Sequence, residues 1–147
     1  MRALISSLVF AGMAMGLSGA AAAEERRIAL LIGNEAYPAV VGRLDNPHED
    51  VDLMAVSLTS ADFAPDDIIV VKDGDQQSML EGVAEFAARL SAANGDGVGF
   101  FYYSGHGASS ESGGQRENYL LPSDAEITTA EQLPIFGVPL TGIIKSL

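Results

Sequence analysis

One of the chain's two histidines stands where it could transfer protons. His106 lies between Gly105 and Gly107 and follows residues 98–103, a run of aromatic and β-branched residues. Such a run predicts a buried strand, and the turn after a strand of an open α/β sheet is where these sheets usually hold ligands. Histidine is the side chain best suited to proton transfer near neutral pH. His106 is therefore a candidate catalytic residue, with a solvated turn residue as the alternative.

Two further apolar runs precede that strand. Residues 27–33 form a continuous apolar run ending in glycine, which predicts a strand buried on both faces, and residues 68–71 predict the next buried strand. Helical periodicity separates the three runs. This alternation implies parallel strands with right-handed crossovers and helices on both faces. We expect an α/β fold, a three-layer α/β/α sandwich with a mainly parallel sheet.

Both expected helices carry N-terminal signals. Asn46 is a suitable N-cap, Pro47 fits the first helical position, and Glu49 completes a capping box; this helix should end near residues 61–62. His48 lies in its first turn and is expected to be a surface residue. Asp75 can cap the second helix, which should end at residues 94–95.

The last forty residues carry weaker patterns. Residues 108–117 are polar and rich in Gly and Ser, which predicts a flexible surface loop. Residues 119–122 suggest a small strand, and residues 125–139 are expected to be irregular. Residues 140–147 look like the first turns of a helix that stops without a C-cap. We therefore expect the fold to be incomplete at the C-terminus.

Composition excludes several kinds of site and partner. The formal net charge of −12 argues against binding to nucleic acid or to anionic membranes. The absence of cysteine excludes disulfides, thiolate metal sites and a cysteine nucleophile within these residues. Residues 73–75 lack the later acidic positions of a calcium loop. No cofactor is predicted, and a requirement for calcium is left open.

The first 23 residues have the pattern of a secretory signal peptide. A positive start is followed by a mostly apolar segment at residues 3–17 and a small-residue stretch that allows cleavage after Ala23. The alternative is an uncleaved membrane anchor. We expect a secreted or periplasmic protein with one domain over residues 24–147.

Four segments, in order, resemble the p20 region of caspase-like cysteine peptidases. They are Arg27–Gly33 with Asn34, the helix start at 46–54, the Tyr-Tyr-Ser-Gly-His-Gly motif at 102–107 and Asn-Tyr-Leu-Leu-Pro-Ser-Asp at 118–124. The resemblance covers residues 26–147 and is to the bacterial metacaspase or orthocaspase branch of the C14 group. It implies a cysteine endopeptidase that acts on proteins or peptides.

The resemblance also implies roles for single residues. His106 would be the histidine of a His-Cys dyad, and the N–H of Gly107 would stabilise the oxyanion. Asp50 and Ser104 match positions that line an acidic pocket for Arg or Lys before the scissile bond. For Asp50 a structural alternative stays open, because a carboxylate in the first turn of a helix is favoured by the helix dipole.

The nucleophile is the departure from the family pattern. In caspases the histidine precedes the cysteine by about 50 residues, which places the expected cysteine near residue 156. We therefore expect a peptidase truncated before its cysteine and inactive alone. The alternative is a catalytically inactive caspase-like binding or scaffolding domain.

Overall fold

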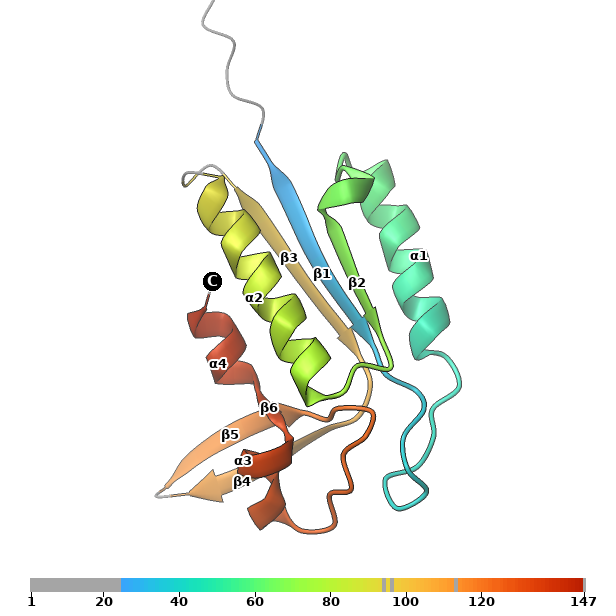
Figure 1. The fold of residues 1–147 in the computed structure, drawn as a ribbon, viewed down its shortest axis with the longest axis vertical. Helices are drawn as coiled ribbons and strands as arrows, with labels where there is room; N and C mark the ends of the chain where they lie inside the picture. The colour runs from blue at the N-terminus through green and yellow to red at the C-terminus, as the bar shows by residue number, and fades with distance from the viewer. Residues whose placement is uncertain (1–24, 94, 96, 113, 147) are drawn as a thin grey trace, which may run out of the picture.

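The fold is built around a central parallel sheet of three strands. The computed structural model describes residues 25–93, 95, 97–112 and 114–146; the expected signal peptide at 1–23 lies outside them. Strands β1 (Arg27–Gly33), β2 (Ile68–Lys72) and β3 (Val98–Ser104) run parallel in the order β2-β1-β3 (Figure 1). Within the described part of the chain, no helix has the length and hydropathy needed to cross a membrane.

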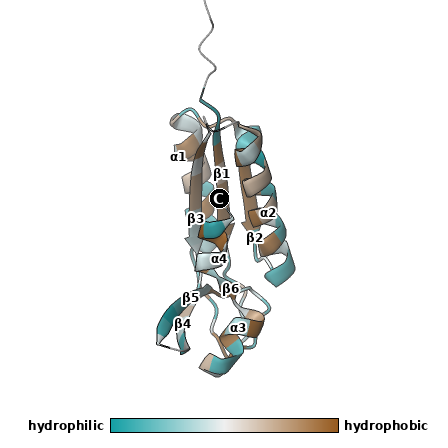
Figure 2. Cartoon of the chain, turned by 90° about the vertical axis from the view of Figure 1, so that its left-hand side faces the viewer, coloured by the Kyte–Doolittle hydropathy of each residue, from teal (hydrophilic) through white to brown (hydrophobic). Residues whose placement is uncertain are grey.

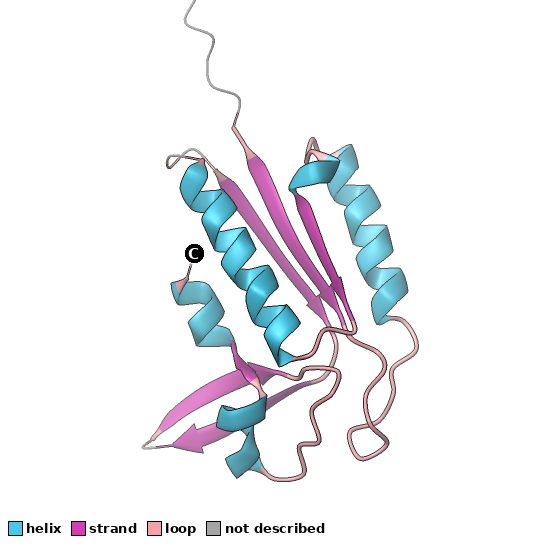
Figure 3. Ribbon diagram, in the orientation of Figure 1, coloured by secondary structure: helices cyan, strands magenta, loops and turns pink. Residues whose placement is uncertain are grey.

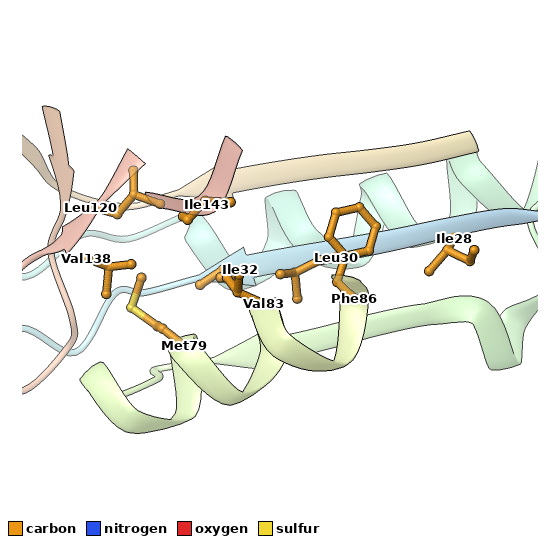
Figure 4. Close-up of a cluster of buried hydrophobic side chains, with 9 residues drawn as sticks. All are labelled: Ile28, Leu30, Ile32, Met79, Val83, Phe86, Leu120, Val138 and Ile143. Atoms are coloured by element: carbon orange, nitrogen blue, oxygen red, sulfur yellow. The ribbon is translucent and has the colours of Figure 1, made fainter. Parts of the chain in front are cut away.

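Helices cover both faces of this sheet. Helix α1 (Pro47–Ser60) lies on one face and α2 (Gln76–Ala92) on the other, as Figure 2 shows. Because side chains alternate along a strand, β1 contributes to a separate core on each face. Ala29 and Leu31 pack toward α1, whereas Leu30 and its alternate neighbours pack toward α2. The larger core, drawn in Figure 4, contains Ile28, Leu30, Ile32, Met79, Val83, Phe86, Leu120, Val138 and Ile143.

The expected burial is confirmed for one of the three strands. Residues 28–33 of β1 are all buried, as a central parallel strand requires. β2 and β3 are only partly buried, so the prediction of two further buried strands is wrong. The reason is their position: each lies at an edge of the three-stranded sheet, where Val70 and Val98 remain 44% and 40% exposed.

The expected flexible loop at residues 108–117 is a β-hairpin. Strands β4 (Gly107–Ser112) and β5 (Gln115–Leu120) pair antiparallel, and β6 (Val138–Pro139) joins β5 to give the order β4-β5-β6. The polar composition of this segment suggested a loop because the β4–β5 hairpin is exposed to solvent and its strands carry polar side chains. Arg116 donates to Ser109 Oγ between the strands, and Gly114 has the positive φ of +75° that suits the turn.

The remaining elements are short (Figure 3). They are the 3-10 helices η1 (Pro65–Asp67) and η2 (Ala130–Gln132), α3 (Leu133–Phe136) and α4 (Leu140–Lys145). The helical start at residue 140 is confirmed, whereas the irregular stretch at 125–139 is partly ordered.

The two predicted N-caps have different outcomes. Asp75 caps α2, since its carboxylate accepts from Ser78 N at 2.8 Å. Asn46 makes no side-chain capping bond, because its backbone is already helical at φ −116° and ψ −9° and not extended as an N-cap requires. The capping box expected there is therefore not formed. α1 ends at Ser60, close to the predicted boundary, and α2 ends at Ala92, slightly before it.

Candidate active site

His106 lies in the turn that joins β3 to β4. This turn lies beyond the carboxyl ends of the parallel strands, at the edge where the second sheet and the 34–46 loop are found (Figure 1). Gly105 is required there because a Cβ atom at this position would lie 2.5 Å from the Tyr103 hydroxyl oxygen and 2.6 Å from that of Tyr37. The glycine before the histidine thus permits a close tyrosine contact.

The imidazole of His106 is fixed by a backbone carbonyl. His106 Nε2 lies 2.8 Å from the carbonyl oxygen of Gly42, and the Tyr37 ring packs edge-on with its centroid 4.7 Å from that of the imidazole. A carbonyl oxygen can only accept, so this bond requires the proton on Nε2. In the neutral ring the basic nitrogen is therefore Nδ1.

Two tyrosines hold the backbone of His106. Its N–H donates to the Tyr37 hydroxyl at 3.0 Å, and its carbonyl accepts from Leu121 N at 2.9 Å and from the Tyr103 hydroxyl at 2.8 Å. The two hydroxyl oxygens lie 3.0 Å apart. Burial raises the pKa of both tyrosines, and for Tyr103 the contact with Tyr37 raises the pKa further. Both side chains therefore remain neutral hydrogen-bonding groups.

A buried asparagine ties three segments together at this edge. Asn34 is fully buried, and its amide group donates to the carbonyls of Leu121 and Gly74 at 3.2 and 3.3 Å. Its carbonyl oxygen accepts from Gly74 N at 2.9 Å. Asn34 thus fixes the end of β1 against the β2–α2 turn and against the segment after β5.

Asp50 and Ser104, which the family resemblance places in one pocket, are in direct contact. Ser104 Oγ donates to Asp50 Oδ2 at 2.8 Å. Asp50 lies in the first turn of α1, and Ser104 ends β3 two residues before His106. The close approach depends on Gly33, where a Cβ atom would lie 2.6 Å from the Pro47 carbonyl oxygen. One carboxylate therefore stands at the same sheet edge as His106.

Gly107 opens β4 with an N–H that points away from β5. Leu121 N donates to the His106 carbonyl, so these two residues form a hydrogen-bonded pair. Gly107 and Leu120 form the next pair of the antiparallel ladder. Positions alternate along such a ladder, so the Gly107 N–H faces outward. Because β4 is an edge strand, this donor faces the open side of the small sheet.

A pocket of about 390 Å³ adjoins His106. Its lining combines apolar side chains with the hydroxyl groups of Ser109, Thr128 and Thr129. It is lined by Val40, Val41, His106, Gly107, Ala108, Ser109, Leu121, Ile127, Thr128, Thr129, Ala130 and Leu133. The loop after β1, the hairpin and the segment before α3 thus border an open depression beside the imidazole.

His48 is not the surface residue that its place in a first helical turn suggested. Its side chain is 28% exposed, with Nε2 3.1 Å from Asp73 Oδ2 and Nδ1 3.6 Å from Glu35 Oε1. The expectation is wrong because the first turn of α1 packs against the loop after β1 and the turn after β2. Among the described residues, no group of three or more His, Asp or Glu side chains is arranged to hold a metal ion.

Sequence reasoning missed the groups that hold His106. In the sequence, Asn34 stands out only as part of a motif, and Tyr37 and Gly42 do not stand out at all. Gly42 acts through its backbone carbonyl, a group that every residue has, so its residue type does not reveal this role. The one available signal was its glycine identity, which its φ of +96° requires.

One comparison with known proteins identifies a family for the chain. A search of curated proteins finds no match to the chain. The family model described as the caspase domain matches residues 26–144, a span that includes both sheets and His106. The chain therefore belongs to the caspase-domain family.

Proposed function

We propose that this chain carries the histidine part of a cysteine endopeptidase site that cleaves after Arg or Lys, as in the metacaspase branch. The contact between His106 Nε2 and Gly42 O carries the proposal, because it leaves Nδ1 as the basic nitrogen. A histidine held in one tautomer at the end of a parallel strand is suited to general base and general acid catalysis.

The nucleophile in this proposal is a cysteine outside the 147 residues, since the chain contains none. His106 Nδ1 would take the thiol proton, and the thiolate sulfur would attack the scissile carbonyl carbon. The imidazolium would then give that proton to the amine as the C–N bond breaks, leaving a thioester that water hydrolyses. The outward N–H of Gly107 is suited to bind the oxyanion of the tetrahedral intermediate.

Asp50 supports the preference for a basic residue before the scissile bond. The Ser104 hydroxyl occupies Asp50 Oδ2 and so orients the carboxylate, leaving Oδ1 to accept from a guanidinium or ammonium group. An acidic residue at this edge would repel a substrate Asp or Glu.

The test begins with the reading frame beyond residue 147. If a cysteine follows, the extended protein is assayed with fluorogenic peptides ending in Arg, Lys or Asp. We expect cleavage after Arg and Lys, abolished in His106→Ala. Asp50→Asn should lower kcat/KM by about tenfold or more, the scale of one charged hydrogen bond. Asp52→Asn is the matched control, because Asp52 lies on the same helix and pairs with Lys72.

The absence of cysteine favours a second candidate, an inactive caspase-like binding domain. A frame that ends at residue 147, or that continues without cysteine, would support it and overturn the peptidase proposal. Cleavage that survives His106→Ala would also overturn the peptidase proposal.

We also propose a secreted or periplasmic location, from the signal-peptide pattern at residues 1–23. N-terminal sequencing of the mature protein should then begin at Glu24.

A further inference from the structure

The loop between β1 and α1 provides two of the groups that hold His106. Gly42 contributes the carbonyl that accepts from the imidazole, and Tyr37 contributes the hydroxyl that accepts from the His106 N–H. Two carbonyls of the loop each accept two backbone hydrogen bonds: that of Glu35 from Tyr37 N at 2.9 Å and Leu44 N at 3.1 Å, and that of Pro38 from Val41 N and Gly42 N, both at 2.9 Å. Glu35 thus joins Tyr37 to the far end of the loop at Leu44, and the Pro38–Gly42 turn that carries the acceptor for His106 lies between these two points.

Asp73 anchors this loop to the neighbouring turn after β2. Its Oδ1 accepts from the backbone N–H groups of Glu35 and Ala36, both at 2.9 Å. Partial burial would raise the pKa of Asp73, but these two hydrogen bonds and the adjacent His48 outweigh it and hold the pKa below its usual value. Asp73 also adopts a φ of +48°, which few residues other than Gly, Asn and Asp tolerate.

His48 contacts the other oxygen of the same carboxylate. Its Nε2 is buried and lies 3.1 Å from Asp73 Oδ2, but the two groups are not aligned as a hydrogen bond. The strength of such an imidazole–carboxylate contact depends on the charge of the imidazole more than on the direction of its N–H bond. The groups facing the ring are Asp73 and Glu35, and Glu35 is itself 2.7 Å from Arg43. Protonated His48 would stand between two carboxylates and attract both.

We propose that Asp73 and His48 form a clamp that positions His106 through the 35–44 loop, and that protonation of His48 tightens this clamp. Asp73 is a positioning residue, because it fixes the loop that carries the acceptor for His106 Nε2–H. The catalytic meaning of the clamp rests on the proposed function, but the clamp itself can be measured in this chain, which has only two histidines.

The experiment is NMR on the full chain, reading the ring ¹⁵N shifts of His106 and the amide exchange of Gly42 between pH 5.5 and 8.5. Asp73→Gly accepts the positive φ and removes both acceptor oxygens. We expect a mixture of His106 tautomers and Gly42 exchange that is faster by about tenfold or more, because two hydrogen bonds to a carboxylate are lost. In the unaltered chain, Gly42 exchange corrected for intrinsic rate should be about fivefold slower at the lower pH, the scale of a partly exposed ion pair.

Three further variants separate the clamp from general stability. Asp75→Ala removes the cap of α2 in the same turn and should lower stability without changing the His106 tautomer. His48→Gln and Asp73→Asn should keep the tautomer and abolish the pH effect on Gly42, even if Asp73→Gly does not fold.

Two results would overturn the proposal: His106 shifts unchanged in Asp73→Gly, or a pH effect that persists in His48→Gln. Neither depends on peptidase activity. An intact clamp in a protein without cleavage would therefore reject only the proposed function.

Discussion

Replacing Tyr37 by Phe should loosen His106 more than any other loss of a single hydroxyl in this core. The hydroxyl accepts from the His106 N–H at 3.0 Å and lies 3.1 Å from the carbonyl of Leu121. Leu121 keeps other donors, including Asn34, but the His106 N–H loses its acceptor. A lost hydrogen bond together with a buried unpaired donor costs about 2 kcal/mol of unfolding free energy.

The measurement is paired urea and thermal unfolding of Tyr37→Phe and Tyr119→Phe. Both tyrosines are buried in the same cluster, at 6% and 8% exposure, but no hydrogen bond is observed for the Tyr119 hydroxyl in the described part of the chain. Tyr119→Phe should change stability by less than about 0.5 kcal/mol. Tyr37→Phe should lower the melting temperature by about 8 °C, since about 1 kcal/mol corresponds to about 4 °C in a domain of this size.

The amide exchange of His106 provides a local readout of the same change. It should accelerate in Tyr37→Phe and stay unchanged in Tyr119→Phe. Equal stability losses in the two variants, or unchanged exchange at His106, would show that the tyrosine acts by ring packing and that its hydroxyl does not position the histidine.

Three further outcomes follow from contacts at both edges of the sheet. Gly105→Ala should lower the free energy of unfolding by about 2 kcal/mol, because the added Cβ atom overpacks against the tyrosine hydroxyls. Gly107→Ala should be tolerated, because the nearest atom to its Cβ would be 3.5 Å away. Similar unfolding curves for the two variants would contradict this explanation. Because burial raises the pKa of Tyr103, the free energy of unfolding should fall as the pH rises above about 10. Tyr103→Phe should reduce the slope of this fall by about 1.4 kcal/mol per pH unit, as measured by urea unfolding at alkaline pH. Hydrogen bonding from Arg26 lowers the pKa of Asp67, so the stabilisation by this carboxylate is present above the usual Asp pKa and is lost as the pH falls below it. Asp67→Asn should therefore be less stable than the parent at pH 7, and the difference should shrink as the pH falls below the usual Asp pKa, as followed by circular dichroism.

The central elements could be predicted because periodicity and burial act on them together. Residues 28–33 are apolar without a break since β1 has a helix on each face, and few environments besides a doubly covered strand produce that pattern. The predictions for β2 and β3 were less accurate because an apolar run cannot distinguish a central strand from an edge strand. The hairpin at 107–120 was missed for the opposite reason: its strands carry Ser and Glu on both faces and so resemble a loop in composition.

The contact between Asp50 and Ser104 could be anticipated only by combining two kinds of information. The first turn of α1 and the end of β3 must approach one another in a parallel α/β unit, and family resemblance named the two residues. Fold geometry alone would have offered every polar residue at that edge. Neither source indicated His48, because its contacts are with Glu35 and Asp73, which lie on two other segments of the chain.

The support of His106 shows why loops are the least predictable part of such a site. The imidazole is held by the carbonyl of Gly42, and its backbone is held by a hydroxyl of the same loop. A backbone carbonyl has the same chemistry at every position, so only the path of the loop selects which one faces the ring. That path is anchored where the Glu35 N–H binds Asp73, a contact between residues 38 positions apart that no local sequence pattern spans. A search for site residues in this family should therefore examine the acceptors around the first loop as well as the residues that react.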